Sequence, residues 1–112
     1  MATPAQRAYS RTTIEAGRLL GQMICLARKE QRTPAQELAD RIGISRATLQ
    51  RIEKGDLKTA LGLYFEAATL LGVTLFTLDE AGLASARRTL QDKLVLLPQP
   101  PRRPSAEVDD EF

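Results

Sequence analysis

The sequence contains no histidine, no tryptophan and a single cysteine among its 112 residues. Without histidine the chain has neither an imidazole general base nor an imidazole metal ligand. One cysteine closes no intrachain disulfide and builds no thiolate zinc site. Paired carboxylates in a recognisable setting and a glycine-rich phosphate loop are also missing. We therefore expect a protein that is not an enzyme, with no catalytic residue, no metal site and no cofactor, and we expect Cys25 to be a small core residue.

Long apolar runs are absent too. No segment approaches the roughly 20 consecutive apolar residues that span a bilayer, and the residues from Met1 to Arg11 are too polar for a signal peptide. We expect a cytoplasmic protein without a membrane partner. The length is enough for one domain.

The charge is small in sum and uneven along the chain. The formal net charge is +2 at pH 7, yet residues 1–60 carry an excess of Lys and Arg, and residues 61–112 an excess of Asp and Glu. A basic half beside an acidic half favours nucleic acid as one partner and a different partner for the other half. The alternative is ordinary solvated charge on a helical surface.

Apolar periodicity divides the chain into four parts. A flexible arm (1–12) has no periodicity, and a folded domain (13–78) repeats apolar residues every three or four positions, which is typical of amphipathic helices. A C-terminal helix (79–97) follows. The tail (98–112) is rich in proline and then acidic, so we expect it to be disordered.

Within the domain, the first helix runs to about Glu30, and a fourth helix is predicted from a cap at Thr59 to Leu71. Gly17 and Gly21 weaken the first helix by roughly 1 kcal/mol each relative to alanine. The side chains predicted to face inward from these two helices are Leu20, Met23, Ile24 and Ala27 in the first, and Leu61, Phe65, Ala68 and Leu71 in the fourth. On the first helix, the polar side chains predicted to lie largely opposite the apolar ones are Arg18, Gln22, Arg28 and Lys29.

Two short helices lie between them. Thr33 is predicted to cap the first, with Pro34 at the first helical position and Gln36 reaching back in a capping box. Gly43 ends this helix in a left-handed conformation, and Ser45 caps the next. Together they form a helix-turn-helix, whose buried apolar set is predicted to be Leu38, Ala39, Ile42, Ile44, Leu49 and Ile52.

The segment after Gly72 is rich in β-branched and aromatic residues, which predicts a short strand of Val73, Thr74, Leu75, Phe76, Thr77 and Leu78. A single strand leaves its backbone groups unpaired, and no second convincing strand exists in this chain. The same strand from a second copy, paired antiparallel across a two-fold axis, supplies the partner. Residues 95–97 are the internal alternative.

The second short helix fits the major groove of B-DNA, which admits one α-helix and reads its first turn against base edges. We expect base contacts from Ser45, Arg46, Ala47, Thr48, Gln50 and Arg51. We expect phosphate contacts from Thr33, Gln36, Lys54 and Lys58. The alternatives are that Arg46 and Arg51 are solvated surface residues and that Thr48 is half-buried in the turn. Glu53 is expected to form a helix-end ion pair, with an arginine of the supporting helix as a candidate partner, and not to be a catalytic carboxylate.

The run QELADRIGISRATLQRIEKGD resembles the helix-turn-helix of the Cro and phage-repressor (XRE) family, and TALGLYFEAATLLGVTLFTL resembles the HipB branch of antitoxins. The resemblance covers residues 18–78. It implies an all-α, five-helix, lambda-repressor-like domain with one short C-terminal strand that pairs across a homodimer. This chain departs from the family pattern at Pro34, usually Thr or Ser, and at Ala35, usually a glutamine that contacts phosphate.

The resemblance also implies a function. Members of the HipB branch repress their own operon by binding a palindromic operator, and they bind a HipA-like serine/threonine kinase toxin. The tail of this chain is similar to tails of such antitoxins, with Asp109, Asp110, Glu111 and Phe112 as its candidate toxin-binding residues. The alternative is a stand-alone transcriptional regulator without a toxin partner, whose C-terminal helix serves only dimerisation.

Overall fold

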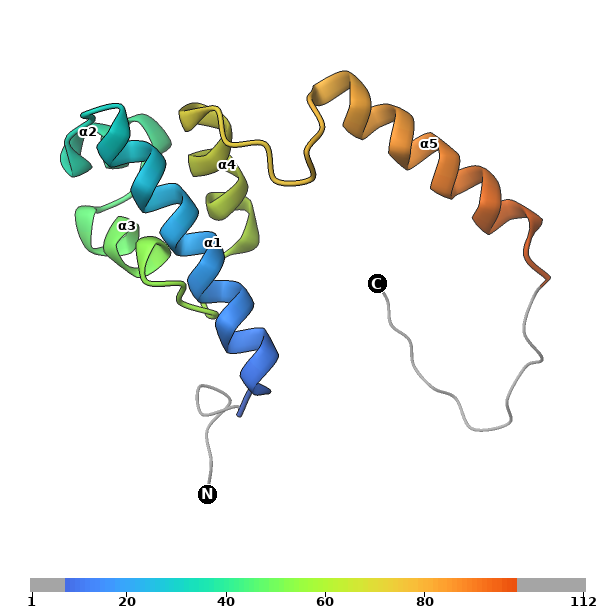
Figure 1. Ribbon diagram of the computed structural model, residues 1–112, viewed down its shortest axis with the longest axis horizontal. Coiled ribbons are helices and arrows are strands. Elements are labelled where there is room, and N and C mark those ends of the chain that lie inside the picture. The colour runs from blue at the N-terminus through green and yellow to red at the C-terminus, as the bar shows by residue number, and fades with distance from the viewer. Residues whose placement is uncertain (1–7, 99–112) are drawn as a thin grey trace. The chain divides into compact units, whose positions relative to one another are not determined.

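The computed structural model describes residues 8–98 (Figure 1). Five helices follow one another: α1 (Arg11–Glu30), α2 (Ala35–Ile42), α3 (Arg46–Glu53), α4 (Leu61–Leu71) and α5 (Glu80–Leu96). The all-α class with five helices is confirmed for this part of the chain. None of these helices combines the length and the apolar content that a bilayer span requires. The candidate tail residues Asp109, Asp110, Glu111 and Phe112 lie outside the described residues.

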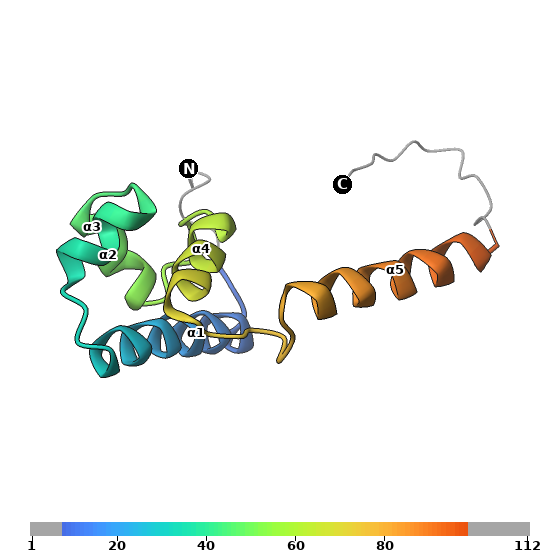
Figure 2. The same ribbon diagram turned by 90° about the horizontal axis from the view of Figure 1, so that it is seen from above.

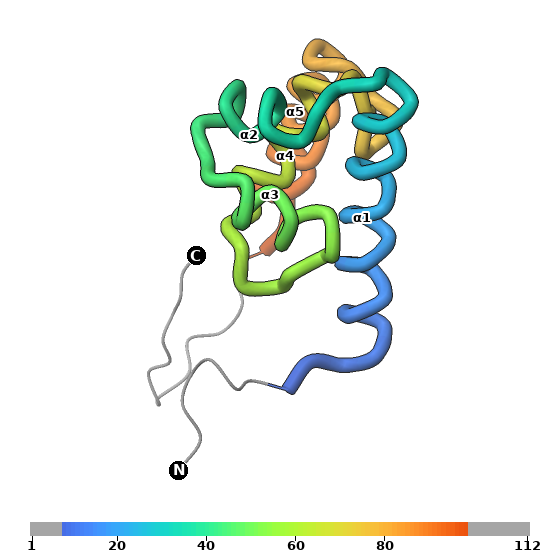
Figure 3. The backbone as a smooth tube through the Cα atoms, turned by 90° about the vertical axis from the view of Figure 1, so that its left-hand side faces the viewer, coloured from blue at the N-terminus to red at the C-terminus, as the bar shows by residue number. Residues whose placement is uncertain are grey.

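The chain divides into two units between Thr77 and Leu78, and each is described by itself. In the first unit α1 packs against α3 and α4, and α2 packs against the same two helices, which Figure 2 shows from above and Figure 3 from the side. The largest fully buried side chains are Ile24, Leu38, Leu49 and Ile52. The predicted apolar set of the helix-turn-helix is confirmed, since Ala39 is also buried, and Ile42 and Ile44 pack partly buried against the core.

The contact between α1 and the end of α3 is a close approach of two backbones. A Cβ atom added to Gly21 would lie 2.5 Å from the carbonyl oxygen of Ile52 and 2.7 Å from the amide nitrogen of Gly55. Gly55 itself has φ 79°, and a Cβ there would lie 2.5 Å from the carbonyl oxygen of Gly17. The glycines that weaken α1 as an isolated helix therefore allow it to contact α3.

Several inward positions predicted from periodicity are wrong. Met23, Leu61 and Phe65 are exposed, and Cys25 is only half-buried. The sequence of α4 is apolar on nearly every side, so periodicity does not determine which face the core takes. The buried residues of α4 are Tyr64, Ala67, Ala68 and Leu71, so the inward positions predicted for Ala68 and Leu71 are confirmed.

The segment predicted as a strand, Val73–Leu78, is a turn in the single chain, and residues 8–98 contain no strand. Gly72 ends α4 with φ 75°, and the amide of Val73 donates to the Ala68 carbonyl at 2.8 Å. Thr77 has φ 56°, which no β-strand contains. A single chain offers this segment no second strand to pair with, so the backbone turns after α4 instead.

The second unit contains α5. Asp79 caps it by accepting a hydrogen bond from the Gly82 amide at 2.8 Å, and no residue of α5 is buried. Apolar residues of α5 are exposed, with Leu90 at 59% and Leu94 at 63%.

The close approach of α1 and α3 predicts the effect of a single methyl group. Gly21→Ala should destabilise the protein by about 2–3 kcal/mol, because the added Cβ meets backbone atoms that no side-chain rotation moves. Gly62→Ala is the matched control: nothing lies within 4 Å of its Cβ position, so the helix propensity of alanine should stabilise α4 by up to about 1 kcal/mol. Urea unfolding measures both, and equal effects of the two substitutions would contradict the backbone contact.

Candidate nucleic-acid interface

The turn between α2 and α3 is built by local hydrogen bonds. Gly43 has φ 87°, and the amides of Gly43 and Ile44 both donate to the carbonyl of Ala39, at 2.8 and 3.0 Å. Ser45 then caps α3, since its Oγ accepts from the Thr48 amide at 3.1 Å. The predicted turn and the predicted cap of α3 are confirmed.

The predicted cap of α2 is wrong. Pro34 occupies the cap position with an extended backbone, and no side chain bonds to the first turn. The backbone of Thr33 is held instead by Arg28, because its amide donates to the Arg28 carbonyl and its carbonyl accepts from Arg28 Nη1, both at 3.0 Å. Gln36 donates to Asp40 at 2.9 Å and does not reach back.

The orientation of α3 is fixed by an ion pair at its C-terminal end. Arg28 of α1 donates to Glu53 through Nε at 2.6 Å and through Nη2 at 3.1 Å, and the two side chains are only 12% and 13% exposed. The hydrogen bond to Glu53, partly offset by burial, raises the pKa of Arg28. The ion pair predicted for Glu53 is confirmed, although periodicity had placed Arg28 on the solvent side of α1.

The outer face of α3 carries most of the residues predicted to contact bases. The exposed residues are Ser45, Arg46, Ala47, Gln50 and Arg51, whereas Leu49 and Ile52 of the same helix are buried. Thr48 is half-buried, and its Oγ1 lies 3.0 Å from Ser45 Oγ. The structure thus presents a polar and basic helix face to solvent.

The residues predicted to contact phosphate lie on both sides of this face. Gln36 stands exposed in the first turn of α2, Lys54 caps the C-terminal end of α3, and Lys58 is exposed in the loop that follows. Thr33 is half-buried just before α2. Of these four residues, Lys58 shares an open groove with α3.

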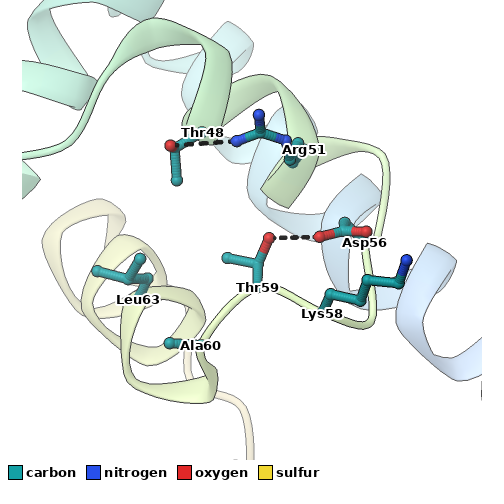
Figure 4. Close-up of a pocket in the computed structure, with 7 residues that line it drawn as sticks. All are labelled: Thr48, Arg51, Asp56, Lys58, Thr59, Ala60 and Leu63. Carbon is teal, nitrogen blue, oxygen red and sulfur yellow. Dashed lines mark hydrogen bonds between the residues drawn. The ribbon is translucent and has the colours of Figure 1, made fainter. Parts of the chain in front are cut away.

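This groove, of about 510 Å³, lies between the end of α3, the loop and the start of α4 (Figure 4). Arg51 Nη1 donates to Thr48 Oγ1 at 3.4 Å on one side, and Thr59 Oγ1 donates to Asp56 Oδ2 at 2.6 Å on the other. The residues that line the groove are Thr48, Arg51, Asp56, Lys58, Thr59, Ala60 and Leu63.

The loop is anchored from below by Tyr64, whose hydroxyl donates to the carbonyl of Asp56 at 2.6 Å. The amide of Asp56 also donates to the carbonyl of Arg51 at 2.9 Å. Sequence reasoning missed both Tyr64 and Asp56, and it assigned Thr59 to a cap of α4, whereas Ala60 holds that position without a side-chain bond. The sequence of the loop does not indicate these contacts, because each of them joins two residues that are several positions apart.

The comparison with protein families supports this geometry. Residues 26–78 match a family model described as helix-turn-helix, a segment that contains α2, α3 and α4. A domain of this type implies DNA binding and indicates a transcription regulator. A search of the curated proteins and a search of the solved structures each found no match.

The burial of Tyr64, which anchors the loop, predicts that the stability of the protein depends on pH. Burial, with a smaller contribution from the charge of Asp56, raises the pKa of Tyr64 to about 12 from an ordinary value of 10.0. The fold favours the neutral phenol, so the stability that this shift contributes is fully present below pH 10.0 and is lost as the pH rises through about 12.

The ultraviolet absorbance of phenolate measures this titration in Tyr9→Phe, which leaves Tyr64 as the one remaining tyrosine of the two in the chain. Tyr64→Phe should remove the loss of stability between pH 10.0 and 12. A midpoint for Tyr64 near that of a free phenol would contradict the burial of its hydroxyl group.

Proposed function

We propose that this chain is a sequence-specific transcriptional repressor of the XRE family. The match of residues 26–78 to a helix-turn-helix family model supports the proposal. The observation that carries the proposal is the exposed polar face of α3, held in a fixed orientation by its ion pair to α1. A helix that enters the major groove needs such a face free of structural contacts and a second element that fixes its angle.

Base recognition is assigned to the first turns of α3. Arg46 has the two parallel donors that match guanine O6 and N7, Gln50 matches adenine, and Ala47 packs against a thymine methyl group. Ser45 and Thr48 bond to each other at the start of the helix and offer hydroxyls to the same region. Backbone phosphates are bound by Gln36, Lys54 and Lys58, and by the hydroxyl of Thr33.

The repressor acts as a symmetric homodimer on a palindromic operator. Two copies of α3 reach successive major grooves when they lie about 34 Å apart, which requires an inverted repeat with half-sites one helical turn apart or a multiple of it. Pairing of Val73–Leu78 with the same segment of a second copy is the proposed dimer contact. The exposure of Phe76, 62%, and of Leu78, 37%, in the single chain supports it.

In its more specific form, the proposal is that this repressor is the antitoxin of a type II toxin–antitoxin system and that it binds a HipA-like serine/threonine kinase toxin. Its support is the resemblance of residues 59–78 to the HipB branch and of the tail to antitoxin tails. The alternative is a stand-alone XRE-family regulator without a toxin partner, which needs only the helix-turn-helix domain that residues 26–78 match.

DNA binding is tested by footprinting the protein on the DNA upstream of its own gene, followed by competition with duplexes altered at single base pairs. Arg46→Ala should cost roughly 1–3 kcal/mol and relax the preference at one base pair, since a base contact is lost. Lys58→Ala should weaken all sequences similarly and flatten the salt dependence, since a phosphate contact is lost.

Arg87→Ala is the control, because it removes the same charge from the exposed surface of α5. An Arg46→Ala protein with unchanged base preference would show that α3 does not read the sequence through this residue.

Removal of the tail distinguishes the antitoxin from the stand-alone regulator. An antitoxin that lacks residues 98–112 should still bind its operator and should lose affinity for the kinase, because the acidic segment and Phe112 are removed. A stand-alone regulator should retain all its activity without these residues. Co-purification of the full chain and of the truncated chain with the products of the same operon measures the difference, and a full chain that captures no kinase would exclude the antitoxin.

A further inference from the structure

The groove beside α3 contains an acidic side chain in an otherwise basic surface. Asp56 is half-buried, and Figure 4 shows its carboxylate turned toward Thr59, with Lys58 beside it. The hydrogen bond from Thr59 holds the carboxylate in place. Among residues 8–98, the ion pairs within 4.0 Å are Arg18–Glu15 and Arg28–Glu53, so the charge of Asp56 is not neutralised by a bonded cation.

Two cations line the same groove. Arg51 stands at the end of α3, where its guanidinium bonds to the Thr48 hydroxyl, and Lys58 projects from the loop. The residues that reach base edges from a recognition helix are those of its N-terminal turns, whereas Arg51 is the sixth residue of the eight in α3. Its place on the rim of a hydroxyl-lined groove suits a phosphate oxygen better than a base.

We propose that this groove binds a backbone phosphate of the DNA between Arg51 and Lys58, and that Asp56 lowers the affinity of the site by electrostatic repulsion. The inference rests on the proposed DNA binding and changes the role of Arg51 from base contact to phosphate contact. Because a phosphate is present at every step of a duplex, the repulsion weakens binding to all sequences alike. At a given salt concentration, a stable complex with DNA then depends more on the base contacts of α3 than it would without this repulsion.

The test uses the full chain with Asp56→Asn, which removes the charge and keeps an oxygen that accepts from Thr59. Its affinity for a random-sequence duplex and for a duplex selected by the wild-type protein should rise by about fivefold at low salt, the effect of one unit charge at roughly 4 Å in water. The gain should shrink as salt screens the charges. Asp92→Asn, the same change on the exposed surface of α5, should have a much smaller effect.

Arg51→Gln provides a second measurement that does not depend on the loop. It should lower affinity for both duplexes by a similar factor and flatten the salt dependence, without altering base preference. An altered preference at one base pair would show that Arg51 reads a base and would overturn the phosphate site.

An Asp56→Asn protein that binds both duplexes as Asp92→Asn does would overturn the repulsion. In either of these outcomes the wild-type protein still binds DNA, so the proposed function stands. A wild-type chain that binds neither duplex overturns both the inference and the proposed function.

Discussion

The contact between α1 and the C-terminal end of α3 is the constraint on which the rest of the domain depends. It has a backbone part, in which Gly21 lets two backbones approach, and a side-chain part, the ion pair of Arg28 with Glu53. A partly buried ion pair adds little net stability, since desolvation offsets much of the attraction between the charges. Its main contribution is to fix the orientation of α3. Two parallel hydrogen bonds hold the guanidinium and the carboxylate at one angle, and Glu53 therefore holds α3 at one angle to α1.

This arrangement separates the packed side of α3 from its solvent-exposed side. Leu49 and Ile52 are buried in the core, and Glu53 bonds to Arg28 of α1. The opposite side therefore carries no packing requirement, and the small side chain of Ala47 lets α3 approach a surface closely. A helix of only eight residues is not stable alone in water, so a free face of this kind requires the dense contacts on the other side.

Features of the sequence that act over a few residues were predicted in part, since the caps expected at Thr33 and Thr59 are not formed. The turn at Gly43 and the cap at Ser45 follow from residue type and spacing, and the exposed positions of α3 follow from its apolar period. Contacts between distant residues were not predicted. Arg28 was placed toward solvent because it lies off the apolar stripe of α1, and only the fold brings it to Glu53. Gly21 was interpreted as a weakness for the same reason, since its role needs the backbone of residue 52 as a neighbour.

The anchoring of the loop after α3 joins stability to recognition. Tyr64 belongs to the core through its ring and to the loop through its hydroxyl, which bonds to the backbone of Asp56. The loop in turn carries Lys58 and closes the groove against α4. A change in the packing of α4 is therefore transmitted to the position of two charges at the edge of the binding face. Because phosphate contacts set the register of a protein on a duplex, the core of this domain would help to determine how α3 meets the bases in the proposed complex with DNA.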